Sequence, residues 1–209
     1  MNIVQFGGGI MNKVVTSKEE IMDVSRRLVL EKGIVSLSMR AIAEACGVAV
    51  GSIYNYFPSK AELLSAAIGS VWEEIFRPFY EREAFGSFTE CVSVLFGTIR
   101  DGNERYPGFF TVHALNFASS DRKKGKEAMT RYLSVLEARL ADALRQDENI
   151  REGVFGEIFS EEVFAGYVFE LMLSIFLRKG QSCEALLEMI RQTIYKGGTC
   201  DAGNRRNII

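Results

Sequence analysis

The chain has 209 residues, of which 47% are hydrophobic, and its formal net charge at pH 7 is −2. This length allows one large domain or a small domain joined to a larger one, and the apolar content can fill a core. The small negative charge argues against a protein that binds polyanions over its whole surface, but a local basic region can exist within a near-neutral total.

The basic residues are concentrated near the start of the chain. Residues 11–60 hold seven basic and five acidic side chains, whereas the remainder has more acidic than basic ones. The seven are Lys13, Lys18, Arg26, Arg27, Lys32, Arg40 and Lys60. This segment is therefore the positive part of the protein.

The cysteines indicate a reducing compartment. They form no C-x-x-C pair and lie among helix-forming residues, which predicts buried thiols and no metal site. They are Cys46, Cys91, Cys183 and Cys200. We therefore expect a cytoplasmic protein without disulfides.

The first residues do not have the features of a targeting segment. Residues 1–15 carry no early positive charge and their short apolar run is broken by three glycines, so they are expected to be a disordered leader, with translation starting at Met1 or Met11. The longest apolar stretch, residues 163–177, contains Glu170 and is shorter than the roughly 20 residues that a membrane span requires. We expect no membrane association.

Apolar residues recur at helical spacing along almost the whole chain, and no stretch alternates with period two for long enough to predict a strand. The sequence therefore predicts an all-α fold. The first helix begins at a capping box, Thr16 with Glu19 or Ser17 with Glu20, and ends at Gly33.

Two short helices are predicted next. Ser38 caps a helix that runs to Ala45, and Gly47 closes it by allowing a left-handed backbone. The following helix covers residues 50–56 and stops near Pro58, because the residue before a proline disfavours helix.

The remaining helices are longer. Ser59 and Glu62 form a capping box for a helix that runs toward Phe76, where Pro78 ends or kinks it. Amphipathic stripes follow in two segments, and two closing helices complete the chain. These four segments are residues 88–99, 129–144, 160–178 and 183–196. Residues 198–209 are expected to be a disordered tail.

Residues 46–60, CGVAVGSIYNYFPSK, indicate a DNA-reading helix. Three short helices within residues 16–60, with a tight turn before the last one, make a helix-turn-helix, whose last helix can enter the major groove. Small residues at its start (Ala49, Gly51 and Ser52) let the backbone approach the bases, and Asn55 can read a base edge. Near its end, Tyr54, Tyr56 and Lys60 offer donors to phosphates. A helical hairpin without a DNA function remains the alternative.

From residue 33 to 64 the chain resembles the tetracycline-repressor (TetR) family of bacterial transcription regulators. Its segment SLSMRAIAEACGVAVGSIYNYFPSKAELL follows the family pattern almost position by position. The resemblance implies phosphate contacts from Ser38 and Arg40 in the second helix, and from Tyr54, Tyr56 and Lys60 around the last one. It also implies that Ala49, Val50, Ser52 and Asn55 face the bases.

Four positions depart from that pattern. Leu37 and Ser38 stand where Thr-Thr or Thr-Ser is common, Cys46 replaces an alanine, and Ala49 replaces the usual serine. The last change removes a hydroxyl at the helix start. The motif covers about 30 residues, and beyond Trp72 only helix count and order support the resemblance.

The larger region, residues 61–197, is implied by the resemblance to dimerise and to bind an effector. A homodimer is also expected physically, because one recognition helix buries too little surface to discriminate a site. The expected interface residues lie on the last two helices: Val168, Leu171, Met172, Ile175, Phe176, Leu187, Ile190 and Ile194. These stripes can alternatively complete the core of a monomer.

An effector pocket is expected among the middle helices. Aromatic residues with few polar groups favour a flat or greasy small molecule. The expected lining is Phe88, Val92, Leu95, Phe96, Phe109, Phe110, His113, Phe117, Tyr132 and Leu136. Each of these residues can instead be simple core, and His113 can be a core histidine rather than one that orients a ligand.

The sequence thus predicts a transcriptional repressor that binds a palindromic double-stranded DNA operator as a homodimer and is released by a small apolar or aromatic effector, with no cofactor. An effector-independent architectural or nucleoid-associated dimer is the alternative. An enzyme is not expected, because no nucleophile–base pair, paired acid cluster or phosphate-binding glycine loop is recognisable.

Overall fold

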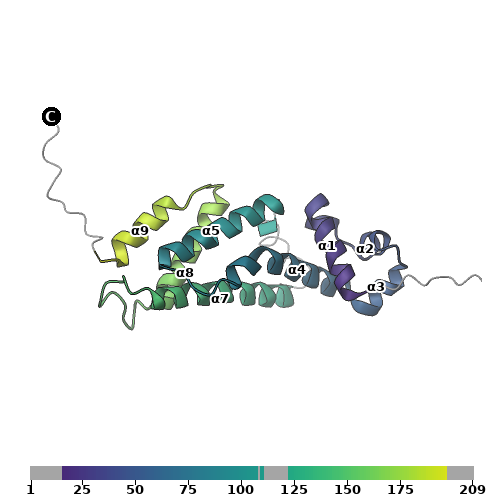
Figure 1. Ribbon diagram of the computed structural model, residues 1–209. Coiled ribbons are helices and arrows are strands. Elements are labelled where there is room, and N and C mark those ends of the chain that lie inside the picture. Colours follow the sequence, from purple (N-terminus) through teal and green to yellow (C-terminus); the bar gives the residue numbers. More distant parts are fainter. Residues whose placement is uncertain (1–15, 108, 111–121, 197–209) are drawn as a thin grey trace, which may run out of the picture. The chain divides into compact units, whose positions relative to one another are not determined.

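The computed structural model describes residues 16–107, 109–110 and 122–196. Within these ranges every regular element is a helix, which confirms the all-α fold (Figure 1). The elements are α1 (Lys18–Lys32), the 3-10 turn η1 (Ile34–Ser36), α2 (Met39–Ala45), α3 (Val50–Tyr56), α4 (Lys60–Tyr80), α5 (Phe88–Arg105), α7 (Arg122–Gln146), α8 (Glu161–Leu177) and α9 (Glu184–Ile194). None of these described helices is long and apolar enough to cross a membrane.

The chain forms two compact units. The first unit comprises the residues up to Ser70, and the second unit begins at Val71. Helix α4 contributes its first part to one unit and its second part to the other. The effector and dimer residues expected from the sequence all belong to the second unit, and the DNA-contact residues all belong to the first.

Serine side chains begin most of the helices. In each case the hydroxyl oxygen accepts the backbone N–H three residues later, which satisfies a donor that the helix leaves without a partner. The pairs and their distances are Ser17 with Glu20 (3.1 Å), Ser38 with Ala41 (3.1 Å), Ser59 with Glu62 (3.2 Å), Ser87 with Glu90 (3.1 Å) and Ser160 with Val163 (3.3 Å). The predicted starts at Ser38 and Ser59 are confirmed, and Ser17 rather than Thr16 caps α1.

Pro78 does not end α4, which continues to Tyr80. A proline inside a helix removes the hydrogen bond to the carbonyl four residues earlier, here that of Glu74. Because Pro78 lies in the last turn, the loss is confined to that turn. The next turn still forms, with the N–H of Glu81 bonded to the carbonyl of Arg77 at 2.9 Å.

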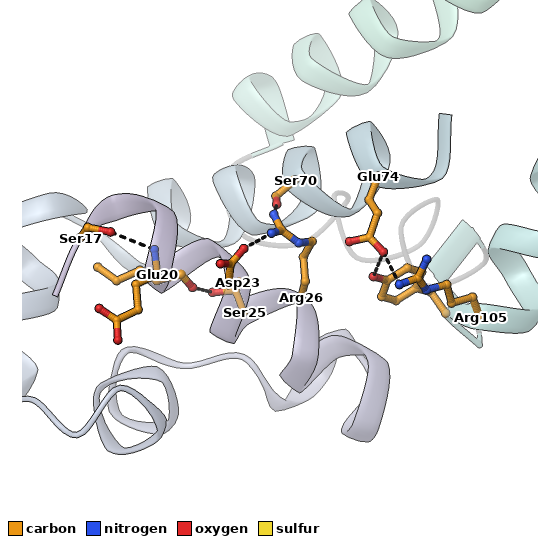
Figure 2. A network of polar contacts seen from close by, with 10 residues as sticks. Ser17, Glu20, Asp23, Ser25, Arg26, Ser70, Glu74 and Arg105 are labelled. Carbon is orange, nitrogen blue, oxygen red and sulfur yellow. Dashed lines mark hydrogen bonds and ion pairs between the residues drawn. The ribbon is translucent and has the colours of Figure 1, made fainter. Parts of the chain in front are cut away.

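The first unit has its own small core. Its buried apolar residues come from all four of its helices: Ile21, Val24, Leu28, Val29, Met39, Ile42, Ala43, Ile53, Leu63 and Ala67. At the edge of this core, the guanidinium of Arg26 bonds both Asp23 and the hydroxyl of Ser70 (Figure 2). This link ties α1 to the first part of α4.

The second unit is built from α5, α7, α8, α9 and the end of α4. Ring contacts join its helices, such as Phe96 stacked on Phe176 with centroids 4.5 Å apart and Phe88 against Phe164 at 5.9 Å. The fully enclosed residues include Leu95, Ile99, Leu136, Leu140, Val168, Met172, Ile190 and Ile194.

A buried carboxylate connects three helix ends in the second unit. Asp147 follows α7, and its Oδ2 accepts the N–H of Phe88 at 2.8 Å and the hydroxyl hydrogen of Tyr195, which follows α9. Its Oδ1 accepts the N–H of Asn149 at 3.0 Å. The Tyr195 oxygen also accepts the N–H of Thr89 at 3.2 Å. The start of α5 is therefore fixed by residues that follow α7 and α9.

Candidate nucleic-acid interface

The turn between α2 and α3 is set by Gly47. Its φ is +67°, in the left-handed region that side chains with a Cβ rarely adopt. The N–H of Gly47 bonds the carbonyl of Glu44 at 3.1 Å, and the N–H of Val48 bonds that of Ala43 at 2.9 Å. These two bonds form a Schellman motif, which ends α2 sharply and aims the chain into α3. The predicted role of Gly47 is confirmed.

Helix α3 has one buried side and one exposed side. Ile53 is fully buried, and Phe57, just after the helix, is also buried. These two residues hold the helix against the first unit. The residues expected to face the bases lie on the other side: Ala49, Val50 and Asn55 are exposed and Ser52 is half-buried. Ala49 precedes α3 without a side-chain cap, as its missing hydroxyl predicts.

Gly51 is not required by the fold around it. A Cβ added there would meet no atom within 4 Å, and its backbone needs no positive φ. Glycine inside a helix costs about 0.5–1 kcal/mol relative to alanine. The fold around Gly51 therefore does not explain a glycine at this exposed position.

The two tyrosines of α3 differ in their partners. Tyr56 donates its hydroxyl hydrogen to the carbonyl oxygen of Thr16, within the first unit. Tyr54 is 48% exposed, and among the described residues no hydrogen bond reaches its hydroxyl. Tyr54 therefore has a donor to offer to a partner, whereas the donor of Tyr56 is already used.

The other expected phosphate contacts lie at helix starts. The Ser38 oxygen accepts the Ala41 N–H, which leaves its own hydrogen available as a donor. Arg40 is exposed in the first turn of α2, and Lys60 is exposed as the first residue of α4. These donors and the exposed side of α3 thus belong to the same unit.

Cys46 is a structural residue of this unit. It is the C-cap of α2 and is buried. Burial raises the pKa of its thiol, and the nearby carboxylate of Glu20 adds to this rise. The thiol therefore stays protonated and unreactive at neutral pH.

In the second unit, the expected effector residues fall into two groups. Phe109, Phe110 and Tyr132 surround the indole of Trp72, with ring centroids 6.4, 5.9 and 5.3 Å from it. Phe88 and Phe96 instead pack on α8, as described above. The remaining described members, Val92, Leu95 and Leu136, are buried, and His113 and Phe117 lie outside the described residues.

Sequence reasoning missed the α4 side of this aromatic group. Trp72, Phe76 and Tyr80 follow one another at four-residue spacing, which places them on one face of α4. The Trp72 and Phe76 centroids are 4.7 Å apart, and those of Phe76 and Tyr80 are 6.2 Å apart. The spacing itself could have identified them.

Most of the expected dimer residues point into the single chain. Val168, Met172, Leu187, Ile190 and Ile194 are buried there, and Ile175 and Phe176 are half-buried. Leu171 is 44% exposed. It shares a face of α8 with two residues that sequence reasoning missed, Val163 and Tyr167, which are 37% and 57% exposed. This exposed stripe has the four-residue spacing of one helix face.

Comparison with known proteins connects these features to a family. Residues 21–67 match the family model of bacterial regulatory proteins of the tetR family. The chain is 41% identical over 58 residues to the HTH-type transcriptional repressor KstR of Mycolicibacterium smegmatis, a match that covers 28% of each chain. The matched segment is thus less than a third of that relative's length.

Two longer similarities extend beyond this segment. The chain is 28% identical over 154 residues to the nucleoid occlusion factor SlmA of Haemophilus ducreyi, which covers 71% of this chain and 72% of that protein. The crystal structure of the transcriptional regulator SCO7518 from Streptomyces coelicolor superimposes with a TM-score of 0.62 at 20% identity, over 84% of this chain and 96% of that one. The fold of the second unit is therefore shared with such regulators.

Proposed function

We propose that this chain, a member of the tetR family of bacterial regulatory proteins, is a cytoplasmic transcriptional repressor. It binds a palindromic DNA operator as a homodimer, and a small apolar or aromatic effector releases it. The first unit binds the operator. The second unit dimerises and holds the effector.

The exposed side of α3 carries the proposal. Its first turn is narrow, because Ala49, Gly51 and Ser52 have little or no side chain, so the backbone can approach base edges in the major groove. Asn55 is exposed and offers both a donor and an acceptor, the pair that recognises adenine. Ile53 fixes the rotation of the helix by its burial, so that this side faces outward.

Phosphate contacts surround this reading surface. We assign them to Tyr54, Lys60, Arg40 and the hydroxyl of Ser38, because each has a donor that the fold leaves accessible. Such contacts position a protein on the duplex without reading sequence. The hydroxyl of Tyr56 serves the fold, since it bonds the end of α3 to Thr16, just before the start of α1.

Dimerisation is assigned to the exposed stripe of α8, Val163, Tyr167 and Leu171. Helix α8 is apolar on nearly all sides, so packing within one chain cannot cover it completely. Aromatic and aliphatic side chains exposed in one row are typical of an interface centre. A two-fold dimer would use the same stripe from both copies.

The decisive experiment is footprinting of the purified protein on the DNA upstream of its own gene. Two protected half-sites about one helical turn apart, related by a two-fold axis, support a dimeric repressor. A screen of small molecules for loss of that footprint then tests the effector. Continuous protection without a defined site would contradict sequence-specific repression.

A second candidate is an effector-independent DNA-binding dimer of the nucleoid-associated class. The similarity to a nucleoid occlusion factor over 71% of this chain favours it. Genome-wide binding distinguishes the two. A repressor occupies a few promoter sites, whereas a nucleoid-associated protein occupies many sites outside promoters.

A further inference from the structure

Aromatic rings gather around Trp72 in the second unit. We define the Trp72 cluster as Trp72, Phe76 and Tyr80 of α4, Phe109 and Phe110, and Tyr132 of α7. The indole contacts four of the other rings, at centroid distances from 4.7 to 6.4 Å. Phe110 also meets Phe76 edge-on at 6.2 Å. Flat molecules are recognised by such combinations of faces and edges.

The indole N–H of Trp72 has no acceptor among the residues that the structure describes. Trp72 is 3% exposed, and within the described part of the chain its Nε1 has no hydrogen-bond partner. A buried donor without a partner is costly, and each such group in a folded protein requires an explanation. An acceptor atom that is supplied from outside the chain would provide one.

Tyr80 is close to this N–H but does not satisfy it. Burial raises the pKa of the Tyr80 hydroxyl, and the Trp72 N–H acts against this rise. The contact between Trp72 Nε1 and the Tyr80 hydroxyl nevertheless falls outside hydrogen-bond geometry, so the Nε1 hydrogen remains available to another acceptor. Tyr80 instead places a second neutral polar group beside the indole.

The polar groups of the cluster are uncharged. Burial also raises the pKa of Tyr132, and the carboxylate of Glu73 adds to the rise, so both phenols stay protonated well above neutral pH. The neighbouring carboxylate of Glu74 is held by Arg105 at 2.6 Å and by the Tyr106 hydroxyl at 3.0 Å (Figure 2). The carboxylate of Glu73 and the guanidinium of Arg131 act on Tyr132 with opposite signs, so these two charges give no net preference for an anion over a neutral ligand.

We infer that the Trp72 cluster binds a neutral, planar, aromatic molecule that carries a carbonyl oxygen, and that this oxygen accepts the hydrogen of Trp72 Nε1. Tyr80, Phe110 and Tyr132 are half-buried, so the ligand reaches the indole from the side on which these rings meet solvent. The inference rests on the proposed function in one respect: such a molecule would act as the effector.

A matched pair of probes tests this chemistry. 9-Fluorenone and fluorene are planar tricycles of nearly equal size that differ by a carbonyl in place of a methylene group. Equilibrium dialysis against the full-length protein gives both affinities. We expect fluorenone to bind about 3- to 10-fold more tightly, the value of one net hydrogen bond. Because Trp72 is the single tryptophan, quenching of its fluorescence by fluorenone also reports the site.

Two variants locate the effect. Trp72→Phe keeps an aromatic ring and removes the N–H, so it should abolish the preference for fluorenone over fluorene. Ile158→Ala, at a position that is 95% exposed, should keep the preference. Equal binding of both probes to the natural protein, or a preference that survives in Trp72→Phe, would overturn the assignment.

A charged probe covers the case in which Trp72→Phe does not fold. The 2-carboxylate of 9-fluorenone should bind the natural protein at least about 10-fold more weakly than fluorenone, and tighter binding would contradict a neutral site. DNA release is measured separately. If fluorenone binds but the protein stays on its DNA, the result supports the site and contradicts its regulatory role. If the protein gives a DNA footprint but does not bind fluorenone, the result contradicts only the ligand chemistry.

Discussion

The hydroxyl of Tyr56 donates its hydrogen to the carbonyl oxygen of Thr16, forty residues earlier in the chain. This bond holds the end of α3 next to the residue before the cap of α1. Tyr54, two positions earlier, is exposed and has no such partner among the described residues. Two tyrosines of one short helix thus have different roles.

Removing the two hydroxyls separately should reveal this difference. Tyr54→Phe should weaken binding to operator and random DNA alike, by about 1.5–3 kcal/mol if its partner is a phosphate, because phosphates carry no sequence information. Tyr56→Phe should instead lower the free energy of unfolding by about 0.5–1.5 kcal/mol. Fluorescence anisotropy and urea denaturation measure the two effects. A loss confined to the operator in Tyr54→Phe would move Tyr54 to the bases.

Lys60 should contribute one ionic contact. Lys60→Ala is expected to reduce the slope of log affinity against log salt by about one, because one phosphate fewer is neutralised. Lys60→Arg should keep the slope, and Lys179→Ala, an exposed lysine of the second unit, should leave it unchanged. Anisotropy titrations between 50 and 200 mM salt, roughly the range over which such slopes are measured, give the values. An unaltered slope in Lys60→Ala would remove this contact.

Asn55 should discriminate one base pair in each half-site. Asn55→Ala is expected to cost about 1–3 kcal/mol at the preferred operator and much less at an operator changed at that position. The comparison is made at one fixed salt concentration, with a thermal melt to monitor folding. Equal losses at both operators would take Asn55 off the reading surface and leave Ser52 as the main candidate.

Asp147 should make the second unit sensitive to acid. Burial alone would raise the pKa of its carboxyl, but hydrogen bonds from Tyr195, the Phe88 N–H and Asn149 outweigh this and lower the pKa below its ordinary value of 3.8. A lowered pKa in the folded state gives stability above the unfolded-state value, and that stability is lost as the pH falls through the folded-state value.

Asp147→Asn should therefore reduce the free energy of unfolding at pH 7 by about 1.5–3 kcal/mol, with the difference from the natural protein shrinking toward pH 3. Urea denaturation across this pH range measures it. Asp142→Asn is the control, since Asp142 forms an exposed ion pair with Arg145 and should cost about 1 kcal/mol or less. A difference that stays constant with pH would show that the Asp147 charge is not involved.

The exposed stripe of α8 should hold the dimer together. Tyr167→Asp with Leu171→Asp is expected to give folded monomers, because carboxylates cannot be solvated in an apolar seam. Val135→Asp, an equally exposed apolar position on α7, should remain dimeric. Sedimentation velocity with circular dichroism distinguishes these states. An intact dimer in the double variant would place the interface on another surface.

Local chemistry was predictable from sequence in the first unit. Ser38, Gly47 and Ser59 act through backbone groups at most five residues away, so the sequence shows both partners together. The orientation of α8 was not predictable, because a helix that is apolar all round has no periodicity to reveal its buried side. Nor was the role of Asp147, whose partners lie 59 and 48 residues away.

The anchoring of α5 has a consequence for synthesis of the chain. Its first turn is held by Asp147 and by Tyr195, which lies 106 residues after Thr89. At ribosomal rates of about 5–20 residues per second, α5 emerges roughly 5–20 s before its last anchor. During that interval the apolar face of α5 lacks its final partners, so the second unit can complete its core only after Tyr195 has been synthesised.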